Sequence, residues 1–79
     1  MARDWYAEAE QIAADLGAEG LLNEADGLRS VITSGATATE ILMGIRWHLQ
    51  NIDRANKTTN LGTKRKVRDL IDELNKVLS

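Results

Sequence analysis

Four segments of this chain carry apolar residues at the three- and four-residue spacing of a helix, and no proline interrupts them. Such spacing places the apolar side chains along one face of an α-helix. The pattern predicts helices at about 4–16, 21–33, 38–55 and 64–78. Because each segment has one main apolar face and the connections are short, we expect an all-α fold, a compact bundle of about four antiparallel helices.

Residues at the helix ends support these limits. Asp4 is a suitable N-cap for the first helix, and Thr37 begins a Thr-Ala-Thr-Glu capping box at the start of the third. Thr63 is expected to cap the fourth helix, after a polar loop at 56–62. Gly27 lies inside the second helix, where the missing side chain would allow another helix to approach closely.

Length and composition limit the possible chemistry. Seventy-nine residues are enough for one domain, 1–79. Cysteine is absent and His48 is the only histidine, so thiolate and multi-histidine metal sites are excluded and no cofactor is expected. No nucleophile with its base and no phosphate-binding motif is present, so we do not expect an enzyme. No apolar run approaches the length of a membrane span, which predicts a cytoplasmic protein with no membrane partner.

The third predicted helix carries a second stripe that a bundle does not require. Nearly opposite the core-facing Ile45, four residues recur at i, i+4, i+7 and i+11: Met43, Trp47, Gln50 and Arg54. Tryptophan and arginine dominate binding hot spots, and methionine suits adaptable contact surfaces. The stripe therefore predicts a protein-binding surface or a homodimer contact, unless another element of the chain packs behind this helix.

Charge is divided unevenly along the chain. Residues 1–40 hold eight acids and two bases, whereas residues 41–79 hold four acids and eight bases, and the whole chain has a net charge of −2. On the first helix an acidic edge lies beside the apolar face: Asp4, Glu8 and Asp15. This edge predicts electrostatic guidance of a basic partner, unless the acidic and basic halves face each other within the bundle.

A basic run begins the fourth helix: Lys64, Arg65, Lys66 and Arg68. Cations at a helix N-terminus oppose the helix dipole. The run therefore predicts either neutralisation by an acidic element of the same chain or contact with an external anion. A nucleic-acid-binding module is the alternative function on this basis, although the net charge of −2 counts against nucleic acid as a partner.

The segment Ser34 to Ile52, SGATATEILMGIRWHLQNI, resembles segments of small helical bacterial proteins of the immunity or antitoxin type. In those proteins a Gly-Ser/Thr-rich turn precedes a helix that begins Thr-Glu-Ile and continues through an Arg-Trp or similar pair. In size and helix number the chain is also similar to the colicin nuclease immunity proteins. It departs from them in its long third helix and in lacking their Tyr-Tyr-Pro type motif, since it has no proline and a single tyrosine, Tyr6.

Because of that departure, no binding residue is carried over from the colicin nuclease immunity proteins. The resemblance implies only a class of behaviour, in which a non-catalytic protein binds a toxin domain one-to-one and neutralises it. The leading hypothesis is an immunity protein whose partner is a bacterial toxin, with a nuclease as one candidate. The alternatives are the nucleic-acid-binding module and a structural module that self-associates through the third helix.

Overall fold

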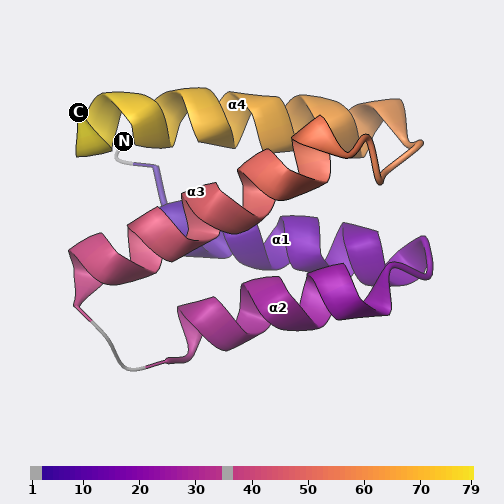
Figure 1. The fold of residues 1–79 in the computed structure, drawn as a ribbon, viewed down its shortest axis with the longest axis horizontal. Coiled ribbons are helices and arrows are strands. Elements are labelled where there is room, and N and C mark those ends of the chain that lie inside the picture. Colours follow the sequence, from indigo (N-terminus) through magenta and orange to yellow (C-terminus); the bar gives the residue numbers. More distant parts are fainter. Residues whose placement is uncertain (1–2, 35–36) are drawn as a thin grey trace.

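The computed structural model describes residues 3–34 and 37–79. Within these ranges lie four helices: α1 (Trp5–Ala18), α2 (Leu22–Ile32), α3 (Ala38–Arg54) and α4 (Leu61–Leu78). Successive helices run in opposite directions, and α4 ends at the side of the bundle where α1 begins (Figure 1). The predicted all-α bundle of four antiparallel helices is confirmed.

The four helices form a closed ring. Each helix packs against the next in the chain, and α4 packs back against α1. α1 and α3 are therefore diagonal across the bundle. All four helices contribute to the core, whose largest fully buried side chains are Ile12, Leu16, Leu28, Ile45, Leu49, Val67, Leu70 and Leu74.

The helix starts agree with two of the three predicted caps. The side chains of Asp4 and Thr37 each accept a hydrogen bond from the backbone N–H three residues further on, so both are N-caps as predicted. The prediction for Thr63 is wrong, because Asn60 caps α4 and accepts a hydrogen bond from the Thr63 N–H at 3.1 Å. α4 therefore begins at Leu61, and Thr63 is buried inside its first turn.

Two glycines allow α2 and α3 to approach closely. A Cβ atom on Gly44 would lie only 2.6 Å from Cγ1 of Val31, so alanine would not fit there without a shift. A Cβ atom on Gly27 would lie 3.0 Å from Cε1 of His48. The close approach predicted for Gly27 is confirmed. α2 ends at Ile32.

The connection between α3 and α4 is attached to the end of α1. Thr58 is only 2% exposed, and its hydroxyl lies 2.6 and 2.7 Å from the two carboxylate oxygens of Glu19. The backbone N–H of Thr59 donates to the same carboxylate at 3.2 Å. These contacts fix the loop that the sequence predicts only as polar, and they place the start of α4 against α1.

Candidate protein-binding face

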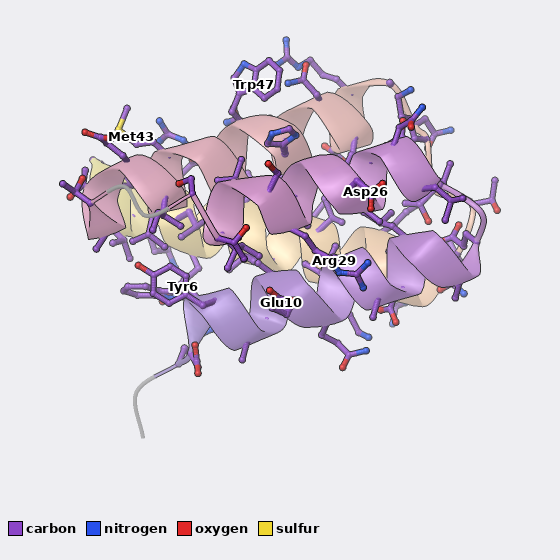
Figure 2. The ribbon with its side chains drawn as sticks, turned by 90° about the horizontal axis from the view of Figure 1, so that it is seen from below. Tyr6, Glu10, Asp26, Arg29, Met43 and Trp47 are labelled. Carbon is purple, nitrogen blue, oxygen red and sulfur yellow. The ribbon has the colours of Figure 1, made fainter. Side chains whose placement is uncertain are left out.

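The outer face of α3 exposes two large apolar side chains, although the opposite face of the same helix is fully buried. Trp47 is 60% exposed and Met43 is 48% exposed, whereas Ile45 and Leu49 have no exposed surface. Both exposed side chains project outward from α3 (Figure 2). The neighbours of α3 in the ring are α2 and α4, which flank it. The alternative in which another element of the described chain packs behind this stripe is therefore wrong for Met43 and Trp47.

Two polar residues continue the stripe toward the end of α3. Gln50 is half-buried and Arg54 is exposed, and the Arg54 guanidinium makes no ion pair or hydrogen bond with another residue in the described part of the chain. We call these four residues the α3 outer face: Met43, Trp47, Gln50 and Arg54. All four come from one helix, so the backbone that carries them is already ordered before a partner binds.

The Trp47 ring is supported from one side. Its edge-to-face contact with the His48 ring has a centroid separation of 4.9 Å and an interplanar angle of 88°. Such aromatic pairs contribute modestly beyond the area that they bury. The contact restricts the ring while leaving most of its surface open, which suits a side chain that presents itself to a partner.

A shallow groove lies beside the α3 outer face, between α2 and α3. Its volume is about 460 Å³, and it is lined by Gly27, Ser30, Val31, Ser34, Glu40, Gly44 and His48. The two glycines at the α2–α3 crossing contribute no side chains to fill it. The exposed Trp47 therefore stands next to a depression, and ridges beside hollows favour shape complementarity with a partner.

His48 forms one wall of this groove and is partly covered by α2. Burial lowers the pKa of His48 below its ordinary value of 6.5, because a partly buried imidazolium loses hydration. The side chain of His48 is half-buried. His48 is therefore expected to be neutral at neutral pH.

The lowered pKa of His48 has a consequence for stability. As the pH falls below about 6.5, the unfolded chain binds a proton at His48 before the folded chain does, so stability decreases. We expect the urea midpoint of the native protein to fall between pH 7.5 and 5.5, and that of His48→Gln to fall less. The pKa values of the Asp15 and Glu24 carboxyls are also lowered. These two groups reduce stability only as the pH falls below their ordinary pKa values of 3.8 and 4.5. If the urea midpoints of the native protein and of His48→Gln fell equally between pH 7.5 and 5.5, the lowered pKa of His48 would be contradicted.

The acidic edge predicted on α1, formed by Asp4, Glu8 and Asp15, lies away from the α3 outer face. Asp15 pairs with Lys66 of α4 at 2.7 Å, and this hydrogen bond lowers the pKa of the Asp15 carboxyl. Glu8 pairs with Arg3, and Asp4 is the N-cap of α1. All three acids therefore have partners within the chain. The structure does not bring them together with the α3 outer face, because α1 is diagonal to α3.

The basic run of α4 is divided between internal pairs and solvent. Lys66 binds Asp15, and Arg68 donates a hydrogen bond to Asp53 at 3.0 Å. Lys64 and Arg65 make no ion pair within the described residues. The expected neutralisation by the chain's own acids thus holds for two of the four bases, and the run does not form one uniform anion-binding surface.

Residues 3–34 and 37–79 hold no group of three or more His, Cys, Asp or Glu side chains placed to bind a metal ion. Over the part of the chain that the structure describes, no helix has the length and apolar character needed to cross a membrane. The chain matches no family model, no curated protein and no solved structure.

Proposed function

We propose that this chain is a non-catalytic protein-binding domain that docks its partner through the α3 outer face. The observation that carries the proposal is that Met43 and Trp47, one helical turn apart, are 48% and 60% exposed on a helix whose buried inner-face residues are at most 6% exposed. Large exposed apolar residues rimmed by polar ones mark interaction sites. Here Met43 and Trp47 supply the apolar centre, and Gln50 and Arg54 supply the polar continuation.

The composition of the α3 outer face fits a binding hot spot. Tryptophan and arginine are the residues whose truncation most often costs more than about 2 kcal/mol of binding free energy. The Arg54 guanidinium has no partner among the residues that the structure describes, so it is available for a carboxylate or carbonyl of another protein. A partner that covered Trp47 would bury apolar area that the bundle itself leaves in water.

The finer proposal is that the partner is a bacterial toxin domain and that binding neutralises it. This part comes from the resemblance of the segment Ser34 to Ile52 to immunity and antitoxin-type proteins. The segment contains the whole α3 outer face except Arg54. The guidance proposed for Asp4, Glu8 and Asp15 is not retained, because these acids are occupied within the chain.

Calorimetric titration against the protein encoded by the adjacent gene tests both levels of the proposal. Trp47→Ala should weaken binding by at least about 30-fold, corresponding to about 2 kcal/mol. The matched control is Leu22→Ala, which removes an apolar side chain that is 63% exposed on α2, and its affinity should stay within about twofold of the native value. Tight binding that survives Trp47→Ala would contradict the docking face. A toxin that the native chain does not bind or inhibit would remove the finer proposal.

A further inference from the structure

The exposed stripe of α3 is longer than the four residues of the α3 outer face. Glu40 is exposed and precedes Met43 by one helical turn. We call this longer stripe the seam. Its residues alternate in steps of three and four: Glu40, Met43, Trp47, Gln50 and Arg54. This is the spacing by which two helices pack along a common seam. Glu40 was not part of the predicted site, although its spacing from Met43 extends the same pattern.

The charges on this seam are placed symmetrically about Trp47. Glu40 lies seven residues before Trp47, and Arg54 lies seven residues after it. Two heptads separate the acid from the base, so both lie on the same side of α3 as the ring. One end of the seam is therefore negative, the other positive, and the centre is aromatic.

Both charged side chains are available to another molecule. Neither Glu40 nor Arg54 makes a side-chain ion pair within residues 3–34 and 37–79. Elsewhere the chain does pair its charges across helices, as with Lys66 and Asp15 or Arg68 and Asp53. The seam thus keeps an unpaired acid and an unpaired base at equal distances from its exposed tryptophan.

We propose that a second copy of this chain covers the seam, with the two α3 helices antiparallel and a twofold axis passing beside Trp47. In this register Arg54 faces the partner's Glu40, and Glu40 faces the partner's Arg54. Trp47 meets the partner's Trp47 at the axis, where paired aromatic rings pack favourably. A twofold contact uses the same patch on both copies, and this patch is complementary to itself in charge.

Other arrangements of the same two helices lose the charge complementarity. A parallel pair in register places like charges opposite each other, which disfavours association. An antiparallel pair with its axis shifted along α3 moves Arg54 away from the partner's Glu40. The charges therefore select one direction and one register, as charges flanking helical seams do in general.

The length of α3 limits how large the contact between the two copies can be. Seventeen residues of α3 give a contact about 25 Å long at most. One such helix pair, with the flanking residues of α2 and α4, would bury on the order of 1,000 Å², the lower limit for a specific interface. Contacts at this lower limit are typical of transient association, so we expect a reversible dimer that forms at high protein concentration.

Sedimentation equilibrium of a charge-exchange series tests the register. Glu40→Arg and Arg54→Glu should each weaken the dimer by at least about tenfold, since each creates two like-charged contacts. The double variant should recover to within about threefold of the native constant, because it restores both pairs in the reverse sense. The matched control is Arg65→Glu, which makes the same charge change at an exposed α4 residue without an ion-pair partner in the described chain, and it should leave the constant unchanged.

Two outcomes would overturn the dimer: a native chain that stays monomeric at about 1 mM, or a dimer whose constant the two single exchanges do not change. Failure of recovery in the double variant would overturn the register.

This inference rests on the proposed function only in using the same face. If the chain were a strict monomer and Trp47→Ala weakened its binding to the toxin domain, the dimer proposal would be contradicted and the proposed docking face would stand. If the chain formed the charge-dependent dimer but bound no toxin domain, the toxin proposal would be contradicted and the dimer proposal would stand.

Discussion

Truncation of Leu49 to alanine is expected to lower the free energy of unfolding by about 3 kcal/mol. Leu49 has no exposed surface and lies in the core between the helices of the ring. Its removal loses apolar burial and leaves a cavity that the closely packed α2 and α3 cannot readily fill. Because a domain of this size has a total stability of about 4 to 12 kcal/mol, Leu49→Ala should shift the urea midpoint strongly.

The matched truncation on the other face of the same helix should behave differently. Trp47 is the larger side chain, yet its 60% exposure and its single aromatic contact with His48 mean that Trp47→Ala should lower the free energy of unfolding by only about 1 kcal/mol. Both variants should be unfolded in urea at low protein concentration, where self-association does not contribute. A loss for Trp47→Ala as large as that for Leu49→Ala would show that the ring belongs to the core.

Replacing Thr58 by valine is expected to cost about 2 kcal/mol, although the two side chains have nearly the same shape. The buried Thr58 hydroxyl contacts the Glu19 carboxylate at 2.6 and 2.7 Å, and valine would leave that carboxylate without its shortest hydrogen bond. Hydrogen bonds to charged groups contribute about 1.5 to 3 kcal/mol. Thermal unfolding at neutral pH measures the loss directly.

Two further variants separate the hydrogen bond from the packing of Thr58. Thr58→Ser keeps the hydroxyl and should lose less than half as much stability as Thr58→Val, since it removes only a methyl group. Glu19→Gln keeps an acceptor but removes its charge, so it should lie between the native protein and Thr58→Val. If Thr58→Val were as stable as the native protein, the contact to Glu19 would not hold the α3–α4 connection in place.

The sequence predicts the helical elements of this fold well because their signals are local. Apolar spacing within each helix and the side chains of Asp4 and Thr37 give the number, direction and most of the limits of the helices. The exposed position of Trp47 also follows from local geometry, since it lies about 200° around the helix from the buried Ile45. One helix cannot bury opposite faces in a ring of four.

The features that the sequence does not predict depend on contacts between distant segments. Asn60 caps α4 in place of Thr63 while Glu19, far away in the chain, holds Thr58 and Thr59 just before it. The acids of α1 look available in the sequence, but the ring order places Asp15 against Lys66. Short connections predict that consecutive helices are neighbours, but composition and spacing do not show which charged side chains meet across the bundle.

Fluorescence quenching of Trp47 by acrylamide tests the central claim, that its ring stands outside the fold and is covered only by another protein. Trp5→Phe leaves Trp47 as the only tryptophan and removes the buried Trp5 Nε1, which has no hydrogen-bond partner within residues 3–34 and 37–79. We expect free quenching in dilute solution and increasing protection as the concentration rises or the toxin domain is added. A ring that is already shielded in the most dilute sample, or that stays equally open under both conditions, would contradict it.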